Sequence, residues 1–489
     1  MIVATRRSAL GAGIAVASTA FTGASLLPLL TARGAEASDT PAPADTTAPA
    51  VELFKVPMPL IPVARPVSTG GGVDTYEVTT RKVTKEILPG IQTELFTYDG
   101  QFPGATIKAR RNRPVVVIQH NGLDVPISRH LHGASLPQQS DGGPMDVIDP
   151  GATRVYTYPN RQPHASLWYH DHAHHQESEN VYRGLQGSYL LGDDAEDALP
   201  LPKGRYDVLV QIRDADFDPT GQLLYAMSDR NRNTLLVNGA PYPYFEVAAR
   251  KYRLRFANTS NMRFFELRLA DGGDLIQIGS DGGLLPSPNT TKSVYLSSGE
   301  RADVVIDFSR YPVGTQVVLE NTAGRGPVEQ VGQVMRFDVT RTADDPSSVP
   351  SVLRTLPALP APTNSRTVVL RMDEDGRADP QAYIDDKIYD PQRVDASIRY
   401  GASEVWTVTN ANTKAAHNFH LHLVQFRVLE RDGNPPGPAE SGLKDTVVLQ
   451  PGETVKLQAT FDTYTGEYVY HCHMLDHSAM GMMATMKIA

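Results

Sequence analysis

Cysteine is almost absent from this sequence. The chain has 489 residues and a single cysteine, Cys472, so it cannot form an internal disulfide. Exported proteins usually carry cysteines in pairs, because oxidising compartments favour disulfides. A lone thiol is therefore either a buried bystander or a functional thiolate, and its sequence neighbours must distinguish the two.

The sequence also lacks basic blocks and long apolar runs after its first residues. Its 46 Lys and Arg are outnumbered by 55 Asp and Glu, for a formal net charge of −9. Without a basic, aromatic-rich patch, nucleic acid is not an expected partner. No stretch after the N-terminal segment approaches the ~18 unbroken apolar residues of a membrane span, so we expect no membrane anchor. We also expect a monomer.

The N-terminus has the features of an export signal. Arg6 and Arg7 precede an apolar stretch that runs to Leu30, and the small-residue pattern at 35–37 is typical of a cleavage site. Residues 1–37 therefore predict export by the twin-arginine route; an ordinary secretory signal with two chance arginines is the alternative. The mature protein is expected to be secreted, at the cell surface or periplasmic.

The remaining chain is rich in strand-forming runs. "PVVVIQH", "YRLRFAN", "RADVVIDF", "TQVVLEN", "EVWTVTN", "TVKLQATF" and "EYVYHCH" are bounded by Gly, Pro, Asn and Asp. No long segment with helical periodicity competes with them outside the signal. The predicted class is all-β, built from Greek-key β-sandwiches.

Composition breaks divide the chain into several pieces. A Ser/Thr/Pro/Ala-rich linker or arm spans 38–72, and further breaks lie at 192–204 and 344–365. We predict three sandwiches at 73–195, 200–342 and 366–489, each near the size of one domain. The middle piece contains no histidine, so metal chemistry must belong to the outer two.

Histidines gather in four short motifs of those outer pieces. Ten of the fourteen lie in "HLH" (His130, His132), "HDH" (His170, His172), "HNFHLH" (His417, His420, His422) and "HCHMLDH" (His471, His473, His477). One such pair could simply be two imidazoles on one strand face, but four clusters indicate metal ligation. The four same-face pairs supply eight imidazoles, which suit a cluster of three metals.

Cys472 lies between two of these histidines. Side chains alternate along a strand, so His471 and His473 face one way and Cys472 the other. There the thiolate can meet His417, His477 and Met482, the ligand set of a blue-copper site. Zinc is the main rival, but structural zinc sites usually hold more cysteines and no methionine. One blue copper and three clustered coppers can hold the four electrons that dioxygen needs to form water.

These motifs resemble those of the multicopper oxidases. "YDGQFPGATI", "HLHG", "LWYHDHA", "HNFHLH", "KDTVVL" and "HCHMLDH" are similar to signatures of the spore-coat laccase and bilirubin-oxidase-like branch. The resemblance covers nearly all of the mature chain and implies three cupredoxin-like domains.

The resemblance also implies a role for each ligand. The type 2 copper would be held by His130 and His420. The two type 3 coppers would be held by His132, His170 and His473, and by His172, His422 and His471. The type 1 copper would be held by His417, Cys472 and His477 with Met482 as axial ligand; Met483 is the nearest competitor, and Met480 is assigned to loop packing.

The implied reaction couples a small-molecule reducing substrate to dioxygen. Electrons would enter at an exposed edge of His477 and pass through Cys472 to His471 and His473, and dioxygen would become water at the three-copper cluster. Asp141 matches the family's acidic residue near the cluster and is a candidate for proton transfer. Many relatives carry Glu after the second type 1 histidine, where this chain has Ser478, and Asp476 is not an obvious substitute.

Several functions remain open at this stage. A laccase-like oxidase of phenols and aromatic amines leads, with bilirubin oxidase or phenoxazinone synthase activity and a Cu(I) or Mn(II) metallo-oxidase as alternatives. A copper carrier using only the type 1 site would not need eight cluster histidines. We expect structural roles for the other histidines and for two aromatic residues: His120, His164, His174, His175, Trp168 and Tyr169.

Overall fold

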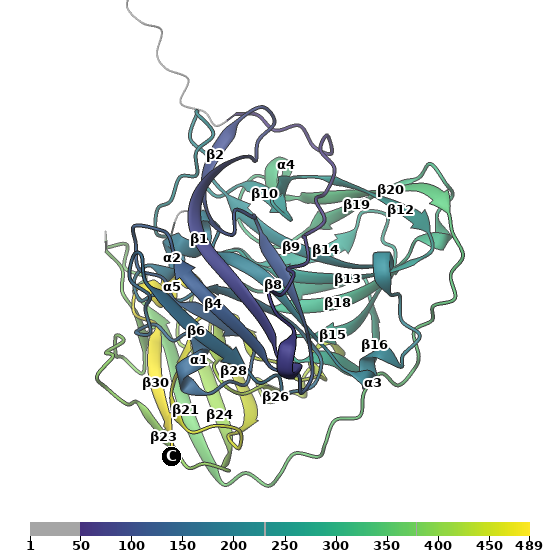
Figure 1. Cartoon of the computed structure of the whole chain (residues 1–489). Coiled ribbons are helices and arrows are strands. Elements are labelled where there is room, and N and C mark those ends of the chain that lie inside the picture. Colours follow the sequence, from purple (N-terminus) through teal and green to yellow (C-terminus); the bar gives the residue numbers. More distant parts are fainter. Residues whose placement is uncertain (1–48, 229–230, 378) are drawn as a thin grey trace, which may run out of the picture. The chain divides into compact units, whose positions relative to one another are not determined.

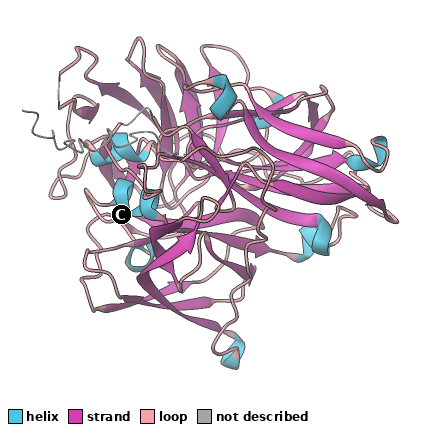
Figure 2. Cartoon of the chain, turned by 90° about the horizontal axis from the view of Figure 1, so that it is seen from above, coloured by secondary structure: helices cyan, strands magenta, loops and turns pink. Residues whose placement is uncertain are grey.

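The computed structural model describes residues 49–228, 231–377 and 379–489. The predicted export signal lies outside these residues, as does the start of the predicted arm. Within them strands dominate, and no helix exceeds the seven residues of α2 (Figure 2). The all-β prediction is confirmed.

The first sandwich packs two four-stranded sheets (Figure 1). One has the order β2 (Gln92–Tyr98), β1 (Asp74–Glu86), β4 (Val115–Asn121), β6 (Thr153–Tyr158). The other has the order β3 (Gly104–Arg110), β8 (Gln186–Gly192), β7 (Ala165–Asp171), β5 (Arg129–His132).

The second sandwich has sheets of seven and five strands. The larger has the order β11 (Ala240–Pro241), β10 (Thr234–Val237), β9 (Asp207–Ala215), β13 (Lys251–Asn258), β18 (Arg301–Asp307), β15 (Leu275–Ser280), β16 (Gly283–Thr291). The smaller has the order β12 (Tyr244–Ala249), β20 (Gln333–Thr342), β19 (Gln316–Asn321), β14 (Phe265–Leu269), β17 (Ser293–Leu296).

The third sandwich has two five-stranded sheets. One has the order β22 (Ala382–Ile384), β21 (Asn364–Met372), β24 (Ser403–Asn410), β28 (Thr454–Thr460), β26 (Phe426–Arg431). The other has the order β23 (Ala396–Ile398), β30 (Met483–Ile488), β29 (Gly466–His471), β25 (His417–Leu421), β27 (Thr446–Leu449). Each sheet takes its strands from one of the three predicted pieces, except that β21 begins at Asn364, two residues before the predicted start of the third piece.

Short helices occupy the connections between strands. The α-helices are α1 (Gln138–Asp141), α2 (Glu177–Arg183), α3 (Asp194–Asp197), α4 (Val328–Val331) and α5 (Leu475–Ala479). The 3-10 turns are η1 (Gly70–Gly72), η2 (Gly204–Tyr206), η3 (Phe308–Arg310) and η4 (Pro438–Glu440). Of these elements, α2 and α5 pack against each other and concern the site below.

Each sandwich has a core of its own. In β4 the burial alternates strictly, so Val115 and Val117 point inward, as the period-2 pattern requires. Separate apolar clusters form around Val117, Val304 and Trp406, and burying each large apolar side chain contributes roughly 1.5–3 kcal/mol. All seven predicted runs form strands. The largest difference is in "EYVYHCH", whose strand ends at His471, two residues early; Phe308 and Phe461 also fall just beyond the strands of their runs.

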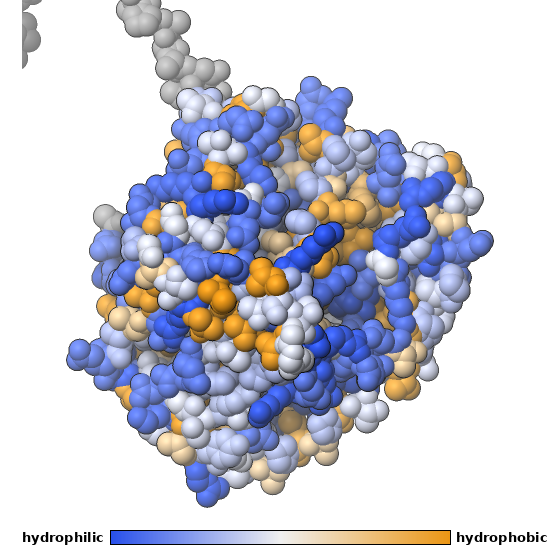
Figure 3. Space-filling view, viewed as in Figure 1, coloured by the Kyte–Doolittle hydropathy of each residue, from blue (hydrophilic) through white to orange (hydrophobic). Residues whose placement is uncertain are grey.

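The linking segments are irregular but packed. In the arm, Val63 bridges Thr106 of the first sandwich. Leu353 of the proline-rich connection is buried against apolar residues of the second sandwich. The surface seen in Figure 3 is mostly hydrophilic, with separate hydrophobic patches. None of the helices in the described ranges is long and apolar enough to cross a membrane.

Candidate metal centres

The single thiol lies in a cluster of potential ligands in the third sandwich. Cys472 Sγ is 3.8 Å from His417 Nδ1 and 3.7 Å from His477 Nδ1, and these two nitrogens are 3.0 Å apart. His417 begins β25, Cys472 directly follows β29, and His477 lies on α5. All three are buried. This set of soft and borderline donors suits a copper ion.

Hydrogen bonds orient these side chains. His417 Nε2 donates to Asn412 Oδ1 at 2.8 Å, which leaves Nδ1 as the free donor atom. α5 is anchored through Asp476, whose carboxylate accepts from Ser228 N–H at 2.7 Å and from Arg232 Nη2 at 3.1 Å. The helix therefore holds His477 in a fixed position beside the thiol.

Two methionines differ in their relation to the thiol. Met482 N–H donates to His477 O and Met482 O accepts from Cys472 N–H, at 3.0 and 3.1 Å. Met482 also belongs to the apolar cluster that contains Cys472, whereas Met483 is outside it, on β30 opposite His471. These contacts favour Met482 over Met483 as the axial ligand.

Burial controls the chemistry of the thiol and of the imidazole beside it. Burial raises the pKa of Cys472 to about 12, so the thiolate needs a cation beside it. Burial lowers the pKa of His477 to about 4 and keeps its ring neutral. His477 is 2% exposed, so little of its expected exposed edge is accessible to solvent.

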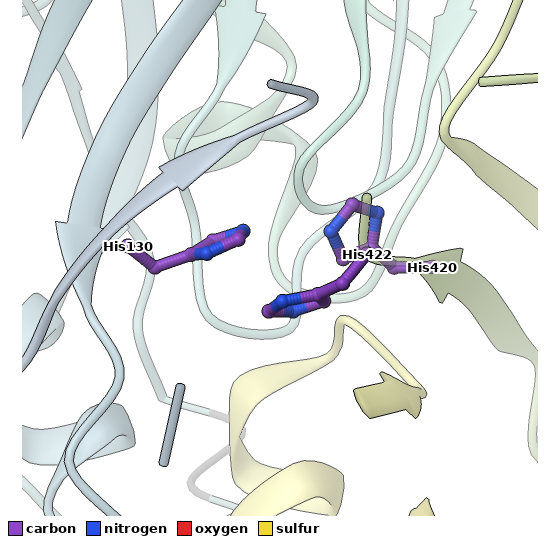
Figure 4. A group of neighbouring side chains, drawn as sticks. All are labelled: His130, His420 and His422. Atoms are coloured by element: carbon purple, nitrogen blue, oxygen red, sulfur yellow. The ribbon is translucent and has the colours of Figure 1, made fainter. Parts of the chain in front are cut away.

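The other eight motif histidines form one buried cluster between the first and third sandwiches. His130 on β5 lies opposite His170 on β7, and His420 on β25 lies opposite His471 on β29. Figure 4 shows His130 approaching His420 and His422 from the facing domain. His172, His422 and His473 each come just after a strand end, so sheet edges from both sandwiches converge on one space.

In most of these rings, one nitrogen is held by an oxygen atom. The Nδ1 atoms of His130, His170, His420 and His471 donate to the backbone carbonyls of Asp141, Asp171, Asp445 and Cys472. His422 Nδ1 donates to Asp141 Oδ2 and His132 Nε2 donates to Asp445 Oδ1, both at 2.8 Å. These bonds fix the ring orientation and turn the second nitrogen inward.

The inward nitrogens fall into three groups. His471 Nε2 lies 3.3 Å from His172 Nε2 and 3.2 Å from His422 Nε2. His473 Nε2 lies 3.0 Å from His132 Nδ1 and 3.3 Å from His170 Nε2. The Nε2 atoms of His130 and His420 are buried without any partner. Orphaned ring nitrogens are costly unless a metal binds them.

The buried environment of the cluster disfavours protonation of its imidazole rings. Burial lowers the pKa of His172 and of His420 to about 4 and depresses the pKa of the other six cluster histidines well below its usual range, with neighbouring imidazoles adding to the effect. Neutral imidazoles are the form that binds transition metals. Eight neutral rings, six of them oriented by hydrogen bonds to oxygen atoms, thus suit several metal ions.

Asp141 is placed at the edge of this cluster. It is buried, its carboxylate accepts from His422, and its Oδ1 has no partner. Burial raises the pKa of this carboxyl well above its usual range. A cavity of about 120 Å³ reaches Asp141 from the surface. A group in this position can exchange protons with solvent.

Sequence reasoning missed the contribution of the histidine-free middle sandwich. Arg301 donates to both oxygens of Asp445, which in turn holds His132. A Cβ at Gly299 would lie 2.7 Å from His473 Nδ1, so only glycine lets the backbone pack on that ring. No sequence signal identifies these partners, because single charged residues and single glycines have no spacing pattern.

The remaining histidines make ordinary contacts. The ring of His120 is hydrogen-bonded to the side chains of Thr153 and Glu77, and the ring of His164 is hydrogen-bonded to Asp193. The rings of His174 and His175 stack on each other. Trp168 is buried and packs on His170 and His132, and Tyr169 O–H donates to Ala105 O.

A larger cavity, of about 470 Å³, opens between the first and third sandwiches. Gly133 and Leu423 on its wall directly follow His132 and His422. His477 is not among the residues that line it. The cavity therefore approaches the eight-histidine cluster rather than the thiol site.

Comparisons with known proteins match this geometry. Three multicopper oxidase family models match residues 79–196, 205–330 and 361–489. The chain belongs to the multicopper oxidase family. A laccase of Bacillus subtilis (strain 168) is 36% identical to it, over 90% of this chain and 99% of the relative. A bilirubin oxidase of Albifimbria verrucaria is 38% identical, over 89% and 81%.

The fold agrees with solved structures of the family. A laccase from Pediococcus acidilactici superimposes with a TM-score of 0.82 at 32% identity, covering 90% of this chain and 95% of that one. As a multicopper oxidase, this chain uses copper, a small reducing substrate and dioxygen as acceptor. The predicted cupredoxin fold is confirmed.

Proposed function

We propose that this multicopper oxidase is a laccase-like enzyme with four copper ions. The observation that carries the proposal is one Cys/His/His group beside a separate cluster of eight imidazoles whose inward nitrogens lie close enough together to hold several ions. His417, Cys472, His477 and Met482 would hold the type 1 ion, and His130 and His420 the type 2 ion. His132, His170 and His473 would hold one type 3 ion, and His172, His422 and His471 the other.

When bound, the four ions supply one-electron acceptance from the substrate and four-electron reduction of dioxygen. The chain's part is to join the two centres by the shortest covalent route. Cys472 lies between His471 and His473 in the sequence, and both rings reach the cluster while Sγ reaches the other site. Asp141 holds a proton at the cluster edge and orients His422.

Phenols and aromatic amines are the proposed substrates. The similarity to the Bacillus laccase supports this class, and the similarity to the Albifimbria bilirubin oxidase keeps a bilirubin-type donor as the alternative. A metallo-oxidase role would call for accessible methionines at the type 1 site. The five methionines of the final stretch are all buried: Met474, Met480, Met482, Met483 and Met486. Burial of these thioethers disfavours a Cu(I) donor.

The test combines metal content with substrate rates. Copper-loaded protein should contain four ions per chain, show the intense visible absorption of a copper–thiolate bond, and consume one dioxygen for every four electrons taken from a phenol. Rates should be compared for a phenol, an aminophenol, bilirubin and Cu(I). One copper per chain without oxygen uptake would contradict the proposal, and fastest turnover on Cu(I) would favour the metallo-oxidase.

Export by the twin-arginine route and a monomeric state complete the proposal. Arg6 and Arg7 support the first, since that pathway exports folded proteins. Replacing both arginines with lysine should leave the protein in the cytoplasm; unchanged export would contradict this route. Light scattering of the uncleaved chain should give the 53.3 kDa mass of one copy, and a mass of twice that value would contradict the monomer.

A further inference from the structure

A buried carboxyl that the mechanism above does not use lies beside the type 1 helix. Glu177, the first residue of α2, is fully buried. Its Oε1 accepts from Ser478 Oγ at 3.2 Å, and its Oε2 has no hydrogen-bond partner. A half-satisfied buried carboxyl is costly to the fold, so it is a candidate for a functional role.

Glu177 lies between the two ligand-bearing segments. It is five residues beyond His172, and its N–H donates to Ala173 O at 2.8 Å. α2 packs directly on α5, where Ser178 Oγ donates to Asp476 Oδ1. Ser478, the hydrogen-bond donor to Glu177, follows His477 in the chain.

The surroundings of Glu177 favour its protonated form. Burial raises the pKa of Glu177 to about 8, and the charge of Asp171 on β7 adds to this, partly offset by the Ser478 hydrogen bond. On α5, Asp476 is paired with Arg232, and His477 is a proposed ligand. On β2, Glu94 is exposed and Tyr98 is buried under Arg129. At neutral pH the carboxyl carries a transferable proton.

A route to solvent lies on the other side of Glu177. Burial and then the charges of Glu177, Asp390 and Asp395 raise the pKa of Tyr389, to about 12. Tyr389 also lines the 120 Å³ cavity whose wall includes Asp141. The ring of His174 packs edge-on against Tyr389, and its Nδ1 is buried without a partner. These polar groups extend from the cavity towards Glu177.

Dioxygen reduction requires a supply of protons. Each dioxygen takes up four electrons and four protons to form two waters. Asp141 lies at one side of the cluster. On the side of α5, Ser478 has no acidic proton but donates to Glu177. Asp476 of the same helix is not available as a proton donor, because its carboxylate is held by Arg232, Ser228 and Ser178.

We propose that Glu177, hydrogen-bonded to Ser478, supplies protons for dioxygen reduction. This rests on the proposed function. The Glu177 carboxyl O–H bond breaks, its proton passes by way of Ser478 or water to an oxygen atom derived from dioxygen, and the carboxylate takes a proton back from solvent by way of the Tyr389 cavity. Glu177 is unchanged at the end of each cycle, and the electrons come only from the reducing substrate.

The first test compares two carboxyls of one helix in the copper-loaded enzyme. Glu177→Gln keeps the shape and the acceptor for Ser478 but has no acidic proton. We expect its kcat to fall about 100-fold below pH 8, with copper content and the blue absorption unchanged, because general acid groups contribute that order of rate. The control is Glu179→Gln. Glu179 lies two residues after Glu177, and its partly exposed carboxyl is paired with Arg183. This control variant should match the unaltered enzyme.

The pH profile separates a proton donor from a structural group. In the unaltered enzyme kcat should fall as pH rises through about 8, because the carboxylate has no proton to give. Glu177→Gln should lack this limb and show a larger solvent isotope effect. Infrared spectroscopy gives a readout that does not depend on turnover: the band of a protonated carboxyl should be present at pH 6 and lost in Glu177→Gln.

If Glu177→Gln takes up too little copper to be assayed, a double variant that exchanges the two side chains tests the proposal instead. Glu177→Ser with Ser478→Glu places the carboxyl on the opposite side of the same contact. Recovery of kcat to within about threefold of the unaltered enzyme would support the relay. A copper-loaded exchange variant as slow as the single Glu177→Ser variant would overturn it, as would an unchanged kcat and pH profile in Glu177→Gln. If the unaltered enzyme takes up no dioxygen, the proposed function itself fails.

Discussion

Arg301 and Asp445 form a bidentate ion pair in the interior, with Nη1–Oδ1 and Nη2–Oδ2 separations of 2.8 and 2.5 Å. Arg301 belongs to the middle sandwich and Asp445 to the third. The same carboxylate accepts from His132 of the first sandwich. All three domains therefore meet at one carboxylate beside the histidine cluster.

Removing the arginine should destabilise both the fold and the cluster. In Arg301→Met the charge of Asp445 stays buried without its main partner, which costs about 3–5 kcal/mol. The free energy of unfolding of the copper-free variant measures this destabilisation. Copper analysis should show that the variant loses copper from the histidine cluster before it loses copper from the thiol site. Arg377→Met removes an exposed partner of Asp375 and should leave the free energy of unfolding almost unchanged, because solvent screens an exposed ion pair. Equal effects of the two variants would contradict the assigned role.

Met482 and Met480 should respond differently to the same substitution. Met482→Leu keeps the volume and removes the thioether, so the type 1 reduction potential should rise, because a weak electron-donating ligand is lost. Met480→Leu, in the adjacent loop, should leave the potential unchanged. Redox titration of the blue absorption measures both. If Met483→Leu shifts the potential and Met482→Leu does not, the axial assignment is wrong.

His471→Gln should separate the two centres. Its Nε2 lies among cluster nitrogens, whereas Cys472 Sγ lies in the other group. We expect the blue absorption to remain and oxygen consumption to fall by at least about 100-fold, as loss of a metal ligand commonly does. Normal oxygen uptake in this variant would show that His471 is not a cluster ligand. His120→Gln, at a partly exposed histidine, is the control.

Without copper, the protein should become acid-sensitive. Burial lowers the pKa of His172 and His420 to about 4 in the folded state, against an ordinary 6.5 in the unfolded chain. The unfolded state thus binds more protons, and stability is lost as pH falls from 6.5 towards 4. At pH 5 each such histidine costs about 2 kcal/mol. Urea unfolding at pH 7.5 and pH 5 measures this, and bound copper should abolish most of it.

Glu177 should shift stability in the opposite direction. Its folded-state pKa of about 8 exceeds the ordinary 4.5, so the folded state binds the extra proton. Stability falls as pH rises from 4.5 through 8. Glu177→Gln should therefore gain stability relative to the unaltered protein at alkaline pH, on the order of 3–5 kcal/mol by pH 9. Thermal unfolding at pH 5 and pH 9 measures it; a pH-independent difference would contradict the raised pKa.

Much of the fold could be predicted from the sequence because strands carry a local signature. Runs rich in Val, Ile and Thr between turn residues mark β4 and β24, and no strong helical pattern competes. The overrun at "EYVYHCH" has a local cause: Cys472 leaves the ladder after His471 but keeps an N–H bond to Met482 O, so the alternation of side chains persists beyond the strand. The multicopper oxidase resemblance is confirmed by the family matches.

What could not be predicted depends on contacts between distant segments. Nothing near Arg301 or Glu177 in the sequence indicates that they lie beside Asp445 and Ser478, which are 144 and 301 residues away. Burial of His477 is likewise a property of the assembled domains. Single carboxyls and arginines have no spacing pattern, so only the three-dimensional contacts distinguish them from surface charges.

His132 and His473 lie 341 positions apart, and this separation has a consequence for biosynthesis. The cluster needs residues from the first and the third sandwich, so a nascent polypeptide has no complete set of ligands until the segment with His471 and His473 has left the ribosome. Truncation after Tyr470 would remove one member of each proposed type 3 group while leaving most of the three sandwiches intact. Copper uptake at the cluster thus reports that synthesis has passed His473.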